Sequence, residues 1–287
     1  MIAELQTTEP RLSIRRLCQL TGTGRSWYYQ HPSAEERARR DVALRDAIEQ
    51  IVLEFPGYGY RRVTAQLQRD DWVVNHKRVV RVMQAESLLC QLKKHFVATT
   101  DSTHGHRRYP NLIKTLLIER LDQVWVADMT YIHLPTAFAY LAAILDAYSR
   151  RCIGWQLSRT IDTHLTLAAL EQALVRRQPM PGVIHHSDQG VQYASQPYVT
   201  RLESAGLHLS MAAVGNPYEN ARAESFFKTL KREEVYLNDY QSFAEAEAHL
   251  DEFIATVYNQ KRLHSSLGYR PPVEFERLVG ASGQPSL

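Results

Sequence analysis

Three apolar segments follow one another between residues 122 and 159, and this run constrains the fold more than any other feature of the sequence. They are QVWVADMTYIHL, AYLAAILDAYSR and RCIGWQLSR, with turn-like breaks between them, which is typical of successive β-strands. Beyond them, helical and strand-like patterns alternate: helix at about 163–178, strand at 183–188, helix near 195–205, strand at 209–214, and helices from about 218 to 236 and from about 242 to 258. This order predicts an α/β fold, a mixed sheet covered by helices.

The beginning of the chain shows a helical period instead. Residues 13–30 predict two short helices around a glycine-containing turn, and Ser13 is the expected N-cap of the first. A helix-turn-helix and a helical hairpin without DNA contact explain this pattern equally well. Residues 35–54 form a charged helical stretch that is either a connector or a packed helix.

Residues 58–90 repeat the helix-turn-helix pattern more strongly, with a helix near 60–69 and a second helix that Asn75 caps. Basic residues early in a helix suit a DNA groove or a phosphate backbone, whereas the simpler alternative is a solvated basic face. Two such patterns in one basic part of the chain favour DNA. The contacts are expected from Arg61, Arg62, Lys77, Arg78 and Arg81.

The charge is divided unevenly along the chain. Residues 1–121 hold 20 Lys and Arg against 13 Asp and Glu, whereas residues 122–287 hold 14 against 18. This division indicates an anion-binding part followed by a part rich in carboxylates, although solvated surface charge can also be split in this way by chance.

These patterns divide the chain into an N-terminal helix-turn-helix region at 1–54, a second helix-turn-helix domain at 55–92, a basic linker at 93–120 and an α/β part at 121–287. The linker contains His95, His104 and His106, but no cysteine or carboxylate pair completes a metal site there. Three scattered cysteines argue against a disulfide framework, and no secretory signal or long apolar span is present. We therefore expect a cytoplasmic protein.

Three acids stand where acids are costly. Asp128 interrupts the first strand, Asp188 ends the strand at 183–188, and Glu224 lies in the long helix. A single buried acid can cap a turn or form an ion pair, but three without an obvious basic neighbour at the first two are better explained as ligands of Mg²⁺ or Mn²⁺. Hard divalent cations prefer such carboxylate oxygens.

The helix that carries Glu224 has two distinct faces. Lys228 and Lys231 fall within about 40° of Glu224 on the helical wheel, whereas Phe226, Phe227 and Leu230 occupy the neighbouring sector. The face with Glu224 is either an exposed surface with an ordinary i,i+4 pair or a metal ligand flanked by cations that meet a phosphodiester. Spacing alone supports both equally.

Asp188 and Glu224 are separated by 35 residues, and Lys231 lies seven after Glu224. This spacing resembles the DDE signature of retroviral integrases and insertion-sequence transposases. Four motifs narrow the resemblance to the second-frame (orfB-type) transposases of the insertion-sequence-three family. They are W-x-x-D-M-T-Y-I at 125–132, H-S-D-Q-G-x-Q-Y at 186–193, G-N-P-Y-E-N-A-x-A-E-S-F-F at 215–227 and Y-N-x-K-R-x-H-x-S-L-G-Y-x-P at 258–271.

The resemblance covers nearly the whole chain and implies a ribonuclease-H-like integrase core. It implies that Asp128, Asp188 and Glu224 are catalytic and bind two Mg²⁺ or Mn²⁺ ions per active site. It further implies binding to the ends of a mobile element and to target DNA, homo-oligomers on DNA, and a first-frame partner protein or fusion. His185, His186 and Ser187 are expected in the core or behind the ligands. Further DNA contacts are expected from Lys228, Lys231, Lys261, Arg262 and His264, although the last three can equally be capping groups at a helix end.

The implied reaction is metal-dependent phosphoryl transfer. Water cuts one DNA strand at the end of the element, and the freed 3′-hydroxyl attacks another phosphodiester, with no covalent enzyme intermediate. Two alternatives stay open: a plain metal-dependent nuclease of the same fold, and a DNA-binding regulator without enzymatic activity.

Overall fold

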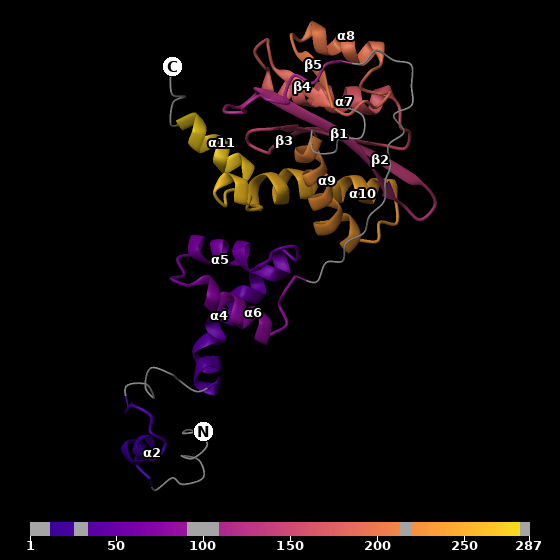
Figure 1. Cartoon of the computed structure of the whole chain (residues 1–287). Coiled ribbons are helices and arrows are strands. Elements are labelled where there is room, and N and C mark those ends of the chain that lie inside the picture. The colour runs from indigo at the N-terminus through magenta and orange to yellow at the C-terminus, as the bar shows by residue number, and fades with distance from the viewer. Residues whose placement is uncertain (1–11, 26–33, 91–108, 213–219, 282–287) are drawn as a thin grey trace. The chain divides into compact units, whose positions relative to one another are not determined.

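The protein was studied as a computed structural model, which describes residues 12–25, 34–90, 109–212 and 220–281 (Figure 1). The chain divides into two compact units, residues 1–90 and 91–287, and each is considered by itself. Within the described ranges, no helix is both long and apolar enough to cross a membrane.

The first unit is helical. Helix α2 (Ile14–Leu20) begins at Ser13, whose side chain accepts a hydrogen bond from the Arg16 N–H at 3.3 Å, so the predicted N-cap is confirmed. The helix predicted to follow it falls mostly on residues 26–33, outside the described residues.

Three longer helices form the rest of this unit: α4 (Ala34–Glu54), α5 (Tyr60–Arg69) and α6 (His76–Ala85). The predicted start of α6 is confirmed, because Asn75 Oδ1 accepts the Lys77 N–H at 2.8 Å. The second half of α4 packs against α5 and α6, and the buried side chains are Leu44, Ile48, Ile51, Val63, Leu67, Val79, Val82 and Met83.

Helix α4 is therefore a packed helix and not a connector. Asp41 near its start forms ion pairs with Arg78 and Arg81 of α6, at 2.7 and 2.6 Å. The division predicted after residue 54 separates α4 from the helices on which it packs, so we propose that residues 34–90 form one DNA-binding unit.

The second unit contains the mixed sheet that the sequence predicts. Its strands are β1 (Val124–His133), β2 (Phe138–Asp146), β3 (Cys152–Ser158), β4 (Ile184–Ser187) and β5 (His208–Met211), in the order β3-β2-β1-β4-β5. β1, β2 and β3 pair antiparallel, whereas β4 is parallel to β1 and β5 is parallel to β4.

Helices cover both faces of this sheet (Figure 1). One face carries α7 (Thr163–Arg177) and α8 (Gln196–Ser204) over Trp125, Ala127 and Ile144. Helix α7 lies so close to β3 that a Cβ on Gly154 would be 2.2 Å from the Ala169 carbonyl oxygen, which explains the glycine.

The opposite face carries α9 (Ala221–Glu233), α10 (Phe243–Glu252) and a π-helix (Phe253–Lys261). Their apolar side chains pack on Val124, Val126 and Leu141, and Phe226, Phe227 and Leu230 are buried there as predicted. The single helix expected at 242–258 differs: after Glu252 it continues as the π-helix. Two 3-10 turns (Val235–Leu237 and Ser265–Leu267) and α11 (Pro272–Ala281) complete the unit.

Part of the predicted linker belongs to this unit. The Leu112 N–H donates to Ser210 Oγ at 2.9 Å, and Ile113 and Ile118 pack on the core below α9 and α10. Residues 109–120 are thus joined to the sheet, whereas the basic residues at 91–108 lie outside the described residues.

A buried ion cluster fixes the last helix. Glu276 of α11 accepts hydrogen bonds from Ser149 Oγ at 2.7 Å and from Arg151 Nη1 at 2.6 Å, and it forms a two-point pair with Arg177 at the end of α7. The cluster joins α11 to two segments that are more than 90 residues away in the sequence, the turn before β3 and the end of α7.

Candidate active site

Asp128 and Asp188 come together at the middle of the sheet. β1 and β4 pair in parallel with Val126 opposite His186, and continuing this register by two residues brings Asp128 level with Asp188. Adjacent strands lie about 4.8 Å apart. The two acids are therefore neighbours, one on the central strand and the other directly after the last residue of β4.

The protonation of Asp128 reflects this crowding. Burial raises the pKa of Asp128 to about 8, and the charge of Asp188 adds to the effect, as does the charge of Glu224 to a smaller degree. The Met129 N–H donates to Asp128 Oδ1 at 2.8 Å, and the charge of Lys231 also favours the ionised form, but both are outweighed.

Glu224 lies in the first turn of α9, and its side chain is exposed. The start of α9 is tied to β1, because the buried Asn220 donates through Nδ2 to the Ala127 carbonyl, next to Asp128, at 3.1 Å. Burial raises the pKa of Glu224. Residues 213–219, which lead into this helix, lie outside the described residues.

The two lysines of α9 differ in their surroundings. Lys231 is half-buried, and its Nζ lies 4.6 Å from the centroid of the Tyr131 ring. Burial lowers the pKa of Lys231, while the charge of Asp128 opposes this, so the ammonium group stands within electrostatic range of the first acid. Lys228 is exposed.

The donors in this region suit a hard divalent cation. They are carboxylate oxygens, and at Asp128 the charge of Lys231 is outweighed by burial and by the neighbouring acids, so the pKa stays raised. Among the described residues, however, no three His, Cys, Asp or Glu side chains lie close enough together to hold one ion. Asp128 and Asp188 are neighbours, and the charge of Glu224 acts on Asp128 more weakly than that of Asp188.

The two histidines before Asp188 are fully buried. His185 Nε2 and the Tyr198 hydroxyl lie 2.9 Å apart, and His186 Nδ1 and Ser210 Oγ lie 2.8 Å apart. Burial lowers the pKa of His185 to about 3, so this ring is neutral. Ser187 Oγ donates to the Asp188 carbonyl at 2.9 Å. All three residues lie in the core, as the sequence analysis favoured.

The basic residues expected near the C-terminus need correction. Arg262 is buried, and its guanidinium makes two 2.7 Å hydrogen bonds to Glu233 at the end of α9. His264 is also buried, with its ring edge against Tyr258 at 4.9 Å between centroids. Neither side chain is available for a DNA track along the surface, because each is enclosed by the fold. Lys261 is exposed.

Sequence reasoning missed the role of Asn259 in the same segment. Its buried amide accepts from the Cys152 N–H and donates to the Cys152 carbonyl, both at 3.0 Å. Asn259 thus ties the π-helix to β3, and Arg262 ties the following residues to α9. The motif at 258–271 is the sequence signal that indicated this segment, but its buried residues Asn259, Arg262 and His264 stabilise the fold.

The basic residues of the first unit also fall into two groups. Arg61 and Lys77 are exposed, and Arg62 is half-buried with its Cζ 5.6 Å from the centroid of the Tyr58 ring. Arg78 and Arg81 are both engaged by Asp41, although each guanidinium side chain keeps more than 40% of its surface exposed. All five residues retain some surface that DNA could meet.

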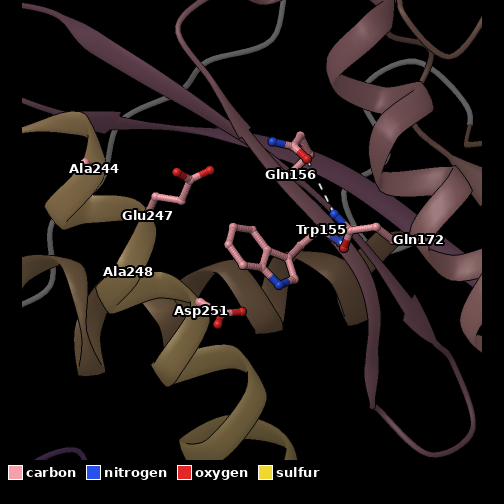
Figure 2. A pocket seen from close by; sticks show the side chains of 7 residues that line it. All are labelled: Trp155, Gln156, Gln172, Ala244, Glu247, Ala248 and Asp251. Carbon is pink, nitrogen blue, oxygen red and sulfur yellow. Dashed lines mark hydrogen bonds between the residues drawn. The ribbon is translucent and has the colours of Figure 1, made fainter.

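A separate pocket of about 410 Å³ lies between β3, α7 and α10, and none of the three acids lines it. Figure 2 shows the Trp155 ring in this pocket with Glu247 and Asp251 of α10 nearby. Carboxylates at its rim oppose phosphate binding, so the pocket does not extend the candidate site toward DNA.

Comparisons with known proteins point in one direction. Residues 119–217 and 205–272 match the family profiles described as integrase core domains, and residues 39–96 match an HTH-like domain. The chain is 35% identical over 251 residues to the transposase for insertion sequence element IS904 of Lactococcus lactis subsp. lactis (strain IL1403), covering 87% of this chain and 98% of that protein.

Two further relatives extend over nearly the whole chain. Identity is 35% over 295 residues to the transposase for insertion sequence element IS629 of Shigella sonnei, covering 98% of this chain and 97% of that protein. It is 30% over 278 residues to transposase InsF for insertion sequence IS3A of Escherichia coli (strain K12), covering 95% and 96%. Among solved structures, the catalytic core domain of BIV integrase superposes with a TM-score of 0.42 at 16% identity, over 56% of this chain and 97% of that chain.

Proposed function

The chain belongs to the insertion-sequence-three family of DNA transposases, enzymes that cut and join DNA strands, and on this basis we propose that Asp128, Asp188 and Glu224 are its catalytic carboxylates. The observation that carries the proposal is the pairing of Asp128 and Asp188 at the centre of the sheet, where the charge of Asp188 helps to raise the pKa of Asp128. Glu224 is included because it lies one turn after Asn220, whose side chain is hydrogen-bonded to the strand that carries Asp128.

The three carboxylates would hold two Mg²⁺ or Mn²⁺ ions. When bound, such ions neutralise charge on the phosphodiester and favour the ionised form of the attacking hydroxyl. The oxygen-only donor set and the raised pKa of Asp128 support this, since a cation relieves the repulsion between the two aspartates. Because no three acids among the described residues are close enough to hold one ion, we propose that α9 moves toward the aspartates when ions and DNA bind.

The chemistry consists of two in-line displacements at phosphorus. In the first, water attacks the phosphodiester at the end of the element; the bond from phosphorus to the 3′-oxygen breaks, and that oxygen takes up a proton. In the second, this 3′-hydroxyl attacks another phosphodiester, so one bond to phosphorus forms for each that breaks. The carboxylates supply no covalent bond. Their role is to hold and orient, and Lys231 contributes positive charge toward the DNA phosphates.

DNA is held by both units in this proposal. In the second unit, Lys228, Lys231 and Lys261 contact phosphates; in the first, Arg61, Arg62, Lys77, Arg78 and Arg81 do so. The protein acts as a homo-oligomer that pairs two element ends, and a first-frame partner or fusion supplies additional end recognition. The core extends from residue 121 to the C-terminus, with residues 109–120 packed onto it.

The test compares Asp188→Asn with Asp162→Asn in the full chain, using labelled DNA ends and Mn²⁺. Asp162 is the N-cap of α7, where asparagine also caps well, so that variant is expected to keep both fold and activity. Asp188→Asn is expected to abolish cleavage and joining while DNA binding survives. A variant that joins strands at the wild-type rate would remove Asp188 from the catalytic set.

The same assay addresses the nearest alternative. Wild-type protein that cuts the labelled ends without ever forming a joined product is a nuclease, and the second displacement would then be withdrawn. DNA binding with neither product, under conditions in which Mn²⁺ binds, would favour the regulator.

A further inference from the structure

Tyr193 lies in the turn between Asp188 and α8, and its side chain is 1% exposed. Its ring packs edge-to-face on Tyr198 with centroids 5.5 Å apart, and its centroid is 6.3 Å from that of His185. The three rings form a buried aromatic cluster below the end of β4.

The hydroxyl groups of the two tyrosines differ. The Tyr198 hydroxyl has a partner, His185 Nε2, at 2.9 Å. The Tyr193 hydroxyl is buried with no hydrogen-bond partner among the described residues. A phenylalanine would fill the same space without burying a polar group, so packing accounts for the ring of Tyr193 but not for its oxygen.

The surroundings of Tyr193 connect it to the two aspartates. A Cβ built on Gly190 would lie 3.0 Å from Asp188 Oδ1 and 3.5 Å from Tyr193 Cδ2, so the carboxylate and the ring border the same point. The turn is held by hydrogen bonds from the Gly190 N–H to Asp188 Oδ1 and from the Tyr193 N–H to the Gly190 carbonyl, both 3.0 Å.

The charges of the aspartates reach the hydroxyl. Burial raises the pKa of Tyr193 well above its ordinary value, and Tyr198, Asp128 and Asp188 add to this in that order. The hydroxyl therefore keeps its proton, and the negative charges of both aspartates act on it.

We propose that the Tyr193 hydroxyl is the hydrogen-bond donor that positions the paired carboxylates of Asp128 and Asp188 when they hold divalent cations. The inference rests on the proposed function, and it makes Tyr193 a positioning residue that touches neither DNA nor the reacting phosphate. A carboxylate that binds a cation through one oxygen presents the other to a donor behind it, and such donors commonly change metal affinity by about 10–100-fold.

The experiment is Tyr193→Phe in the full chain, with Tyr198→Phe as the matched control from the same cluster. Two quantities are measured: the thermal midpoint in EDTA, and Mn²⁺ binding by calorimetry, alongside the Mn²⁺ concentration that gives half-maximal strand joining. Tyr193→Phe is expected to leave the midpoint in EDTA unchanged or higher and to weaken Mn²⁺ binding about tenfold.

Tyr198→Phe is expected to behave in the opposite way. It deprives His185 of its partner, so the midpoint in EDTA falls, while Mn²⁺ binding by the folded protein stays at the wild-type value. Wild-type Mn²⁺ affinity in Tyr193→Phe overturns the proposal. A lowered midpoint in EDTA for Tyr193→Phe also overturns it, because the hydroxyl would then be structural.

Calorimetry separates this inference from the proposed function. If the wild-type protein binds Mn²⁺ in a Tyr193-dependent manner but never joins strands, the transposition chemistry fails and the positioning role stands. If the wild-type protein does not bind Mn²⁺, both are overturned.

Discussion

Two groups of partly buried carboxylates in the second unit differ in how their charge is compensated. Around Glu276, burial alone would raise the pKa of the carboxyl, but hydrogen bonds and charge from Arg177, with Ser149 and Arg151, outweigh it and lower the pKa. Around Asp128, burial and the neighbouring Asp188 raise the pKa to about 8, and Lys231 offsets little of this.

The difference between these pKa shifts indicates what the carboxylates of each group do in the protein. At α11 two arginines compensate the acid that joins the segments, whereas at Asp128 the single nearby cation, Lys231, is outweighed. An acid left uncompensated at the centre of a sheet is costly to the folded state, and that cost is typical of a functional site.

The largest expected effect comes from Asp128→Asn. Strand cleavage and joining should fall at least about 10³-fold, equivalent to about 4 kcal/mol in the barrier, because one of the cation-holding groups is lost. In EDTA at pH 8 the same variant should be more stable than wild type toward urea, because a repelling charge is gone. If Asp128→Asn is instead less stable than wild type, Asp128 stabilises the fold as Glu276 does, and the contrast between the two groups is wrong.

Glu276→Gln should have the opposite effects, a loss of stability without a loss of strand joining. Removing the acid leaves the largely enclosed Arg177 with only its longer pair to Asp122 at 3.4 Å, which is expected to lower the free energy of unfolding by about 3 kcal/mol. Strand joining per folded molecule should be unchanged. Glu274→Gln on the same helix is the control, since the pair of Glu274 with Arg270 is partly exposed and should be worth less than about 1 kcal/mol. Equal losses in the two variants would refute the structural role of the cluster.

The two groups should also respond to pH in opposite directions. Since the pKa of Asp128 is about 8 in the folded protein and its ordinary value is 3.8, the folded state keeps a proton that the unfolded chain releases between these values. Stability in EDTA should therefore fall as pH rises from about 4 to about 8, by at most about 1.4 kcal/mol per pH unit. The lowered pKa of Glu276 stabilises above its ordinary 4.5, and this contribution is lost as pH falls.

Urea unfolding at several pH values in EDTA would measure this dependence. Asp128→Asn should flatten the fall toward pH 8, Glu276→Gln should not, and saturating Mn²⁺ should flatten it in the wild type. A fall toward pH 8 that persists in Asp128→Asn would assign it to another group.

The smallest effect is expected at Asp41 in the first unit, an acid that has arginine partners as Glu276 does. Hydrogen bonds from Arg78 and Arg81 outweigh the effect of burial and lower the pKa of Asp41, but both arginines are nearly half exposed. Asp41→Asn should therefore cost less than about 1 kcal/mol. Hydrogen exchange in α4 and α6 should speed up by at most about fivefold, and a loss as large as that of Glu276→Gln would contradict the role assigned to exposure.

Local patterns were sufficient to predict the layers of the fold. The strand at 124–133 and the acids at 128 and 188 follow from apolar runs and from the points at which they are interrupted or end, which neighbouring residues determine. The caps at Ser13 and Asn75 are local for the same reason.

Long-range pairs were not predictable. Arg262 looks like a DNA contact in the sequence because Glu233, its buried partner, is 29 residues away, and nothing local indicates that the two meet. The π-helix was not predictable for the same reason, because its Asn259 bonds the backbone of Cys152, which is distant in the sequence. For Glu224, spacing along the helix left a metal ligand and an exposed face equally open, and the resemblance favoured the ligand.

The side chains that bond the backbone of β3 have a consequence for the solubility of the protein. β3 is an edge strand, and an edge with open backbone groups can recruit a strand of another molecule. Asn259 bonds both backbone groups of Cys152, Arg176 bonds the Ile153 carbonyl at 3.1 Å, and Gln172 accepts the Trp155 N–H at 3.4 Å. With these groups already occupied, β3 offers a poor template for edge-to-edge aggregation.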